Sequence, residues 1–284
     1  MPSKFSERLL KIATFACSAI SIGAVVCICL FLFGGGWPAL QTIGLGNFFG
    51  GLVWAPSNGS YGILSLICGT LAVTGLAILI GFPLGLLCAV YLAFECPKRL
   101  YSFLHGAIML MAGIPSVVYG FFGLTVLVPF IRTTFGGPGM SLLAASVLLG
   151  FMVLPTVASV SLASIQTAAP GVYEASRALG STHERTIFHA VLPAARSGIM
   201  ASLILGIGRA AGETMAVMMV AGNQPVLPSG LLDGVRTLTA NIAMEMGYAA
   251  GLQREALIAC GAVLLLMIFV LNIGLFYAQK RRNA

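Results

Sequence analysis

Six long stretches of apolar residues are separated by short polar or glycine-rich segments. They cover residues 12–33, 62–94, 104–131, 141–168, 197–221 and 256–278. A helix needs about 20 mostly apolar residues to cross a bilayer, so the pattern predicts an all-α membrane protein with six transmembrane helices. The first stretch is longer than the core of a signal peptide and no small-residue cleavage site follows it. We therefore expect a retained anchor helix.

Glycine and proline interrupt the pattern at several places. Pro83 lies inside the second stretch and is flanked by Gly81 and Gly85, which predicts a kink and a close approach of a neighbouring helix. Pro115 lies near the start of the third stretch. Residues 34–60 combine three consecutive glycines with two prolines and two tryptophans. This composition predicts an outer loop at the membrane interface.

Charged residues are scarce and unevenly distributed. They make up 8% of the chain against 58% hydrophobic residues, whereas a soluble domain carries about 25% charged residues. With the N-terminus inside, 11 of the 15 Lys and Arg fall in inner segments and 3 in outer ones, and Arg209 lies within a stretch. We therefore expect cytoplasmic termini and a cytoplasmic 170–196 segment. The net charge of +7 forms no basic patch suited to nucleic acid.

The 170–196 segment has an ordered pattern of its own. Gly180 is typical of a helix C-terminal stop, and Ser181 with Glu184 three residues later forms a capping box. Pro193 predicts a second stop. The pattern predicts two short helices at an angle, which project from the membrane and dock on a partner. The alternative is a pair of solvated interfacial helices with no partner.

Two opposite charges lie within the fifth apolar stretch. Arg209 and Glu213 are four residues apart, so on a continuous helix they share one face. Ionisable side chains inside a membrane are costly and usually functional, although a mutually neutralising pair that holds helices together is the alternative. The planar guanidinium of arginine can donate two parallel hydrogen bonds to an oxyanion. These residues therefore predict the wall of an anion pathway.

Several kinds of site find no support in the sequence. The seven cysteines lie in apolar stretches or beside a basic loop without metal-ligand spacing, so neither a disulfide nor a metal centre is expected. No phosphate-binding loop of the Gly-x-x-x-x-Gly-Lys-Ser/Thr type occurs, so we do not expect the chain itself to hydrolyse ATP. The histidines are interpreted as polar surface residues: His105, His183 and His189.

Glu174-Ala175-Ser176, followed by Gly180 and then Leu192-Pro193, resembles the EAA motif of ABC importer permeases. In that family the motif forms a helix that docks on the ATP-hydrolysing subunit. Ser176 stands where the motif has its second alanine, and Ala190 where isoleucine is usual. The resemblance assigns ATPase coupling to Glu174, Ala175, Ser176, Gly180, Ser181, Glu184, Leu192 and Pro193.

The segment Gly208-Arg209-Ala210-Ala211-Gly212-Glu213-Thr214-Met215-Ala216-Val217, with Gly222-Asn223 after it, is similar to the fifth helix of PstC-type permeases of the phosphate-specific ABC importer. Trp54-Ala55-Pro56 and the run from Ile114 to Gly120 agree with the same family. The resemblance implies a substrate pathway that contains Arg209, Glu213 and Thr214. No catalytic residue is implied.

The resemblance also implies an architecture and a set of partners. The fold would be that of a type I ABC importer permease (MetI-like), with an anchor helix and outer loop in residues 1–60 and the permease core in residues 61–284. The partners would be a PstA-type permease, a PstB-type ATPase dimer that holds ATP and Mg, a periplasmic or lipid-anchored phosphate-binding protein, and membrane lipid. The chain itself would carry no cofactor and would lie in the bacterial inner membrane.

Two other functions remain open from the residues alone. One is an ABC permease for another oxyanion such as sulfate or molybdate, which the 170–196 segment does not distinguish from a phosphate permease. The other is an ion-coupled secondary transporter. Such transporters often contain inverted repeats and paired broken helices, and the sequence contains no evident internal repeat.

Overall fold

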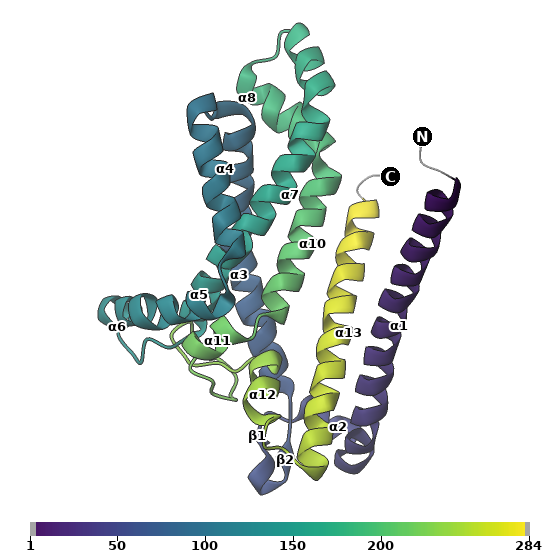
Figure 1. Cartoon of the computed structure of the whole chain (residues 1–284). Coiled ribbons are helices and arrows are strands. Elements are labelled where there is room, and N and C mark those ends of the chain that lie inside the picture. Colours follow the sequence, from purple (N-terminus) through teal and green to yellow (C-terminus); the bar gives the residue numbers. More distant parts are fainter. Residues whose placement is uncertain (1–3, 282–284) are drawn as a thin grey trace.

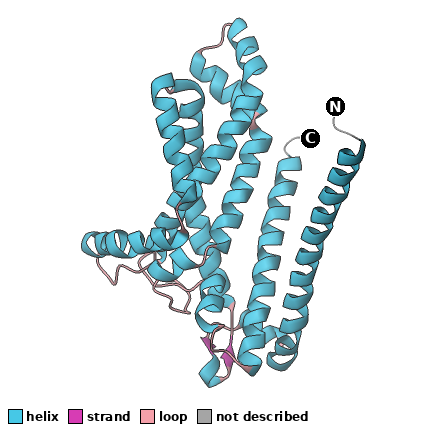
Figure 2. Ribbon diagram, viewed as in Figure 1, coloured by secondary structure: helices cyan, strands magenta, loops and turns pink. Residues whose placement is uncertain are grey.

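The computed structural model describes residues 4–281, and its secondary structure is almost entirely helical (Figures 1 and 2). In chain order the helices are α1 (Lys4–Ile43), α2 (Leu45–Gly50), α3 (Leu64–Val90), α4 (Lys98–Gly113), α5 (Ser116–Phe122), α6 (Val128–Phe135), α7 (Leu142–Ala178), α8 (His183–Thr186), α9 (Leu192–Ala194), α10 (Arg196–Gly212), α11 (Met215–Val220), α12 (Leu238–Glu245) and α13 (Gly251–Arg281). The short elements are the π-helical turns η2 (Tyr91–Glu95), η3 (Gly123–Leu127) and η4 (Ile187–Val191), the 3-10 turn η1 (Pro56–Asn58) and the strands β1 (Trp54–Ala55) and β2 (Ser60–Tyr61). The predicted all-α class is confirmed.

Within the described residues, 5 helical segments are long and apolar enough to cross a membrane, and the number rises to 6 if one bent pair counts as a single span. That pair joins His183–Ala194 to Arg196–Gly212 at an angle of 70°. The helices α3, α7 and α10 pack against one another, α4 lies against α7, and α1 pairs with α13. Figure 1 shows α8 at the same end of the molecule as the ends of α1 and α13 nearest the termini, with β1 and β2 at the opposite end.

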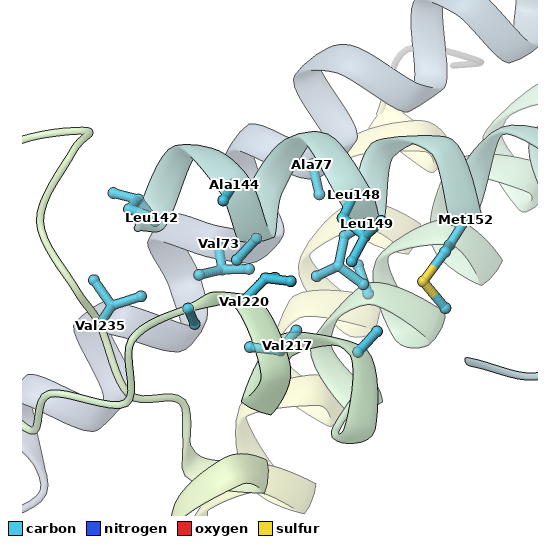
Figure 3. Close-up of a cluster of buried hydrophobic side chains, with 14 of the residues drawn as sticks. Val73, Ala77, Leu142, Ala144, Leu148, Leu149, Met152, Val217, Val220 and Val235 are labelled. Carbon is cyan, nitrogen blue, oxygen red and sulfur yellow. The ribbon is translucent and has the colours of Figure 1, made fainter. Parts of the chain in front are cut away.

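Small residues allow α3 and α7 to cross closely, as the glycine spacing predicts. A Cβ atom added to Gly81 would lie 2.5 Å from the Gly150 carbonyl oxygen, and one added to Gly85 would lie 2.8 Å from the Val157 Cβ. Beside this crossing, Val73 of α3, Leu149 of α7 and residues of α11 form a buried apolar cluster (Figure 3). Helices in a membrane associate largely through such close packing, because lipid is as apolar as their side chains.

The prediction of an outer loop over residues 34–60 is wrong for most of that range. Helix α1 continues through the glycines and Pro38 as far as Ile43, and only α2 and a short hairpin follow it. In the hairpin Trp54 pairs with Tyr61. A Cβ atom on Gly36 would lie 2.8 Å from the Ala259 Cα of α13, so this glycine allows a helix contact rather than a turn.

The third apolar stretch is not one continuous helix. Helix α4 ends at Gly113, and Ile114 adopts an extended conformation with φ −67° and ψ 128°. A proline disfavours a helical conformation in the residue before it, so Pro115 explains the break. The chain then continues through α5, η3 and α6, which lie across the direction of α4 in Figure 1. Pro83 and Pro155, by contrast, lie inside continuous helices.

Candidate functional site

Arg209 lies in the last turn of α10 and its side chain is exposed. Its Nη1 lies 3.5 Å from the Thr156 hydroxyl of α7. Among the described residues, no ion pair joins Arg209 to a carboxylate. Within the described residues the guanidinium of Arg209 thus meets a neutral hydroxyl, and it keeps hydrogen-bond donors for an oxyanion.

The prediction that Arg209 and Glu213 share a face of one helix is wrong. Helix α10 ends at Gly212, and Glu213 leaves the helix with φ −69° and ψ 132° before α11 begins at Met215. The predicted span 197–221 is therefore broken. The Thr239 hydroxyl donates to the Glu213 carbonyl oxygen at 2.9 Å, which fixes the chain at the break.

The Glu213 carboxylate binds the N-terminal end of α11, the helix that follows it. Its Oε1 accepts hydrogen bonds from the backbone N–H groups of Thr214, at 3.1 Å, and Ala216, at 3.3 Å. These groups belong to the start of α11, where the first N–H groups have no partner within the helix. The Thr214 hydroxyl donates to the Gly212 carbonyl oxygen at 3.3 Å. Glu213 and Thr214 thus shape the break rather than neutralise Arg209.

Residues 172–194 form a helical hairpin that differs in two ways from the predicted pair of short helices. Its first arm is the continuous end of α7, which runs to Ala178, and its second arm consists of α8, η4 and α9. Gly180 turns the chain with φ +85°, as its position predicts. The Ser181 N–H donates to the Ser176 carbonyl oxygen at 3.3 Å, and Arg177 Nη1 donates to the Ser181 carbonyl oxygen at 2.7 Å.

The predicted capping box between Ser181 and Glu184 does not form, and the helix start lies one residue later. The N-cap of α8 is Thr182, whose hydroxyl accepts from the Arg185 N–H at 3.3 Å, so Ser181 is not the cap. Helix α9 ends at Ala194, one residue after Pro193, so the predicted stop near Pro193 is confirmed. The sharp bend occurs at Ala195, between α9 and α10.

The 172–194 hairpin exposes apolar side chains at its turn and on its second arm. Leu179 is 88% exposed and Phe188 is 54% exposed. Of the residues assigned to coupling, the exposed ones are Glu174, Ala175, Gly180, Glu184 and Pro193, and the partly buried ones are Ser176, Ser181 and Leu192. Large apolar groups exposed beside charged ones are typical of a surface that binds another protein.

His183 has contacts that the sequence interpretation missed. The Tyr173 hydroxyl of α7 lies 2.7 Å from its Nδ1, and the Glu95 carboxylate of η2 lies 2.6 Å from its Nε2. The residue is therefore more than a polar surface residue. Glu95 precedes His183 by 88 positions, so no local pattern in the sequence could have revealed the contact.

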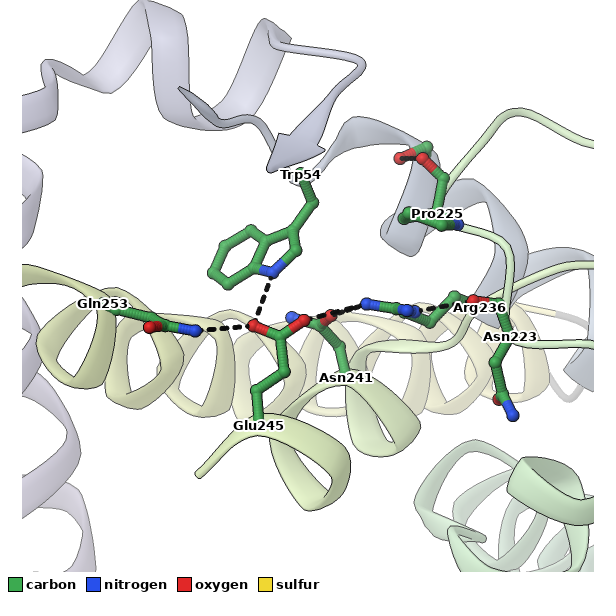
Figure 4. Close-up of polar contacts among 8 residues, drawn as sticks. Trp54, Asn223, Pro225, Arg236, Asn241, Glu245 and Gln253 are labelled. Atoms are coloured by element: carbon green, nitrogen blue, oxygen red, sulfur yellow. Dashed lines mark hydrogen bonds and ion pairs between the residues drawn. The ribbon is translucent and has the colours of Figure 1, made fainter. Parts of the chain in front are cut away.

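A second missed group is a buried polar network at the opposite end of the molecule (Figure 4). The Glu245 carboxylate of α12 forms an ion pair with Arg236 at 2.9 Å and accepts hydrogen bonds from Trp54 Nε1 and Gln253 Nε2, both at 2.9 Å. Arg236 also donates to the Asn223 carbonyl oxygen at 2.9 Å and to Asn241 Oδ1 at 3.0 Å. The network joins the hairpin β1–β2 to the loop after α11 and to α12 and α13.

Several known proteins are similar to this chain in sequence. The chain is 40% identical over 275 residues to the probable ABC transporter permease protein YqgH of Bacillus subtilis, which covers 94% of this chain and 89% of the relative. It is 34% identical to the phosphate transport system permease protein PstC of Mesorhizobium japonicum, over 90% of this chain and 85% of the relative. The phosphate transport system permease protein PstC of Xylella fastidiosa strain Temecula1 is 36% identical, and the match covers 93% of this chain and 87% of the relative.

Solved structures agree on the fold. An inward-facing MetNI methionine ABC transporter matches with a TM-score of 0.54 and 21% identity, over 81% of this chain and 97% of the solved chain. A crystal structure of an amino acid ABC transporter with histidines matches with a TM-score of 0.54, and the match covers 77% of this chain and 93% of the solved chain. These matches confirm the predicted type I importer permease fold.

The family model for the inner membrane component of binding-protein-dependent transport systems matches residues 81–283. This range contains α10, the break at Glu213 and the whole 172–194 hairpin. The chain therefore belongs to the family of binding-protein-dependent transport system inner membrane components, as a multi-pass translocation subunit of the PstC type.

Proposed function

We propose that this chain is the permease subunit of an ATP-driven importer that carries inorganic phosphate across the bacterial inner membrane. The observation that carries the proposal is Arg209, an exposed guanidinium on a membrane-spanning helix without a carboxylate partner among the described residues. Its planar donors suit an oxyanion. Relatives at 34% and 36% identity are phosphate transport permeases, which favours phosphate over sulfate or molybdate.

The break between α10 and α11 determines how Arg209 and Glu213 contribute to the proposed pathway. Because Glu213 leaves the helix and binds the N–H groups of α11, its negative charge is partly balanced by those donors. Arg209 then contributes positive potential beside a carboxylate that does not bind it directly. A weak site of this kind lets an anion enter and leave, whereas a tight site would trap it.

The partners follow from the same proposal. A PstA-type permease would form the other side of the pathway, and a phosphate-binding protein, periplasmic or lipid-anchored, would deliver the ion. A PstB-type ATPase dimer, which would hold ATP and Mg, would dock on the 172–194 hairpin, where Leu179 and Phe188 are exposed. Residues 1–60 would anchor the permease core of residues 61–284 through the pairing of α1 with α13.

We also propose that both termini and the 172–194 hairpin face the cytoplasm, since basic residues gather at that end. A cysteine in place of Ser57, an exposed residue in the turn between β1 and β2, should react with a membrane-impermeant thiol reagent in intact spheroplasts. In the same background, with native cysteines replaced, Glu184→Cys should react only after the membrane is opened. The reverse pattern would overturn the orientation.

The pathway is tested by two single substitutions. Arg209→Lys keeps the charge but loses the planar donor pair, and phosphate uptake should fall roughly tenfold. Glu213→Gln keeps an oxygen that can accept from the N–H groups of Thr214 and Ala216 but removes the charge, and uptake should fall while the complex still assembles.

Uptake of labelled phosphate is measured in a permease-null strain that also carries the partner subunits, and is normalised to complex assembled in the membrane. Uptake of labelled sulfate and molybdate is measured in the same way. If the wild type takes up either anion in preference to phosphate, phosphate is not its substrate. ATP-independent uptake in proteoliposomes would favour a secondary transporter. If both variants assemble and transport phosphate at the wild-type rate, Arg209 and Glu213 do not form the pathway.

A further inference from the structure

Three aromatic rings and one carboxylate connect the 172–194 hairpin to the end of α3. Phe94 of η2 stacks on Tyr173 of α7, with ring centroids 5.6 Å apart and an interplanar angle of 22°. His183 of α8 meets both rings edge-on, at 6.3 Å from Phe94 and 5.9 Å from Tyr173. Glu95, next to Phe94, lies 2.6 Å from the far nitrogen of the His183 ring. Two adjacent residues of η2 thus contact both arms of the hairpin.

The remaining polar contacts of the hairpin hold its own arms together. The hydroxyls of Ser176 and Thr186 lie 3.1 Å apart, and Arg177 binds the turn through the Ser181 carbonyl oxygen. The contact between His183 and Glu95 differs because it crosses from the second arm to η2. Since η2 continues α3, and α3 packs against α7 and α10, a displacement of α8 would reach the transmembrane bundle by this short route.

The local backbone supports a role in motion. η2 is a π-helical turn, and such turns within α-helices are frequent at functional sites. The second arm of the hairpin contains another π-helical turn, η4. The side chains of His183 and Glu95 are 34% and 54% exposed. A polar contact this exposed contributes little to stability, so the position it gives to His183 and Glu95 matters more than its energy.

The hydrogen bonds persist whichever protonation state His183 adopts. With a neutral ring, Nε2–H donates to Glu95 and Nδ1 accepts from the Tyr173 hydroxyl. With a protonated ring, both nitrogens donate, and the Tyr173 oxygen accepts instead. The hydrogen-bonded chain from Tyr173 through His183 to Glu95 is therefore unbroken with either a neutral or a protonated ring, as a mechanical connection requires.

We propose that the Tyr173–His183–Glu95 chain is a strut that transmits movement of the ATPase-facing hairpin to α3, with His183 and Glu95 as positioning residues for transport. This inference rests on the proposed function. The strut binds neither phosphate nor ATP. Its loss should separate ATP hydrolysis from transport while the ATPase still docks through the exposed end of the hairpin.

The test uses the complete transporter in proteoliposomes and measures phosphate transported per ATP hydrolysed. His183→Ala should lower this ratio several-fold, because the connection between α8 and η2 is lost, with co-purification of the ATPase unchanged. His183→Gln, whose amide can donate to Glu95 and accept from Tyr173, should restore most of the ratio. Glu95→Ala should match His183→Ala, and the double variant should be no worse than either. His105→Ala, which changes a partly buried histidine of α4 outside the hairpin, is the control and should keep the wild-type ratio.

The outcomes separate the two proposals. If the wild-type complex hydrolyses ATP but carries no phosphate, the proposed function fails. If it carries phosphate and His183→Ala retains the wild-type ratio, the strut fails and the proposed function stands. Additive losses in the double variant would also overturn the strut, because residues that act through one contact are not independent. Loss of the ATPase from His183→Ala but not from His183→Gln would make His183 a docking residue and would contradict the strut.

Discussion

Replacing Glu245 by alanine is expected to destabilise the protein by about 3–5 kcal/mol, the usual cost of removing one partner of a buried ion pair. The Glu245 side chain is 9% exposed and that of Arg236 is 14% exposed. The substitution removes the negative charge that pairs with the Arg236 guanidinium. It also removes the oxygen that accepts hydrogen bonds from Trp54 Nε1 and Gln253 Nε2. Buried donors without an acceptor add their own desolvation cost.

The measurement is thermal unfolding of the purified complex in detergent, followed by an optical signal and by retention on size exclusion. Glu255→Ala is the matched control, because Glu255 is a partly buried glutamate of α13 whose side chain makes no ion pair or hydrogen bond within the described part of the chain. The double variant Arg236→Met/Glu245→Leu should recover much of the loss, since apolar residues of similar volume often replace a buried pair without cost. A Glu245→Ala protein as stable as the control would contradict the network's structural role.

The network also explains why residues 34–60 were misinterpreted. Hydropathy reports how apolar a residue is but not what it contacts. Gly36 is used for a close approach to α13, and Trp54 is buried with its indole N–H on Glu245 rather than exposed at the membrane interface. The partner of Trp54 lies 191 positions later in the chain. A glycine in a turn and a glycine at a helix crossing look the same in one sequence.

Local chemistry was more predictable where the backbone alone decides. Gly180 has the positive φ that its place after a helix predicts, whereas the third stretch, predicted as one span, is broken at Pro115. Arg209 was conspicuous because a charge within an apolar stretch needs no structure to be noticed. The break at Glu213 was not predictable, because Thr239, from a distant segment, binds its carbonyl oxygen. His183 likewise acquires its partner only in the folded chain.

The second large effect is expected at the crossing of α3 and α7. Gly81→Leu should prevent normal packing of the two helices and reduce the yield of folded protein severely. The nearest atom to an added Cβ is the Gly150 carbonyl oxygen at 2.5 Å, and the Gly150 Cα follows at 3.1 Å. Both belong to the backbone of α7, so no side-chain rotation relieves the clash. Overpacking a tight core typically costs about 1–3 kcal/mol, and a backbone neighbour places this site at or above the upper end.

Gly75→Leu is the matched control, because Gly75 lies on the same helix, is exposed, and has no atom within 4 Å of an added Cβ. The same residue is introduced into the same helix, so differences in propensity and hydrophobicity cancel. Folded yield and thermal unfolding of the two variants are compared in one detergent. Gly81→Ala should show an intermediate loss, since the first carbon already lies within contact distance of the carbonyl. If Gly81→Leu folds and melts as Gly75→Leu does, then α3 and α7 do not cross at Gly81, and the central packing described above is incorrect.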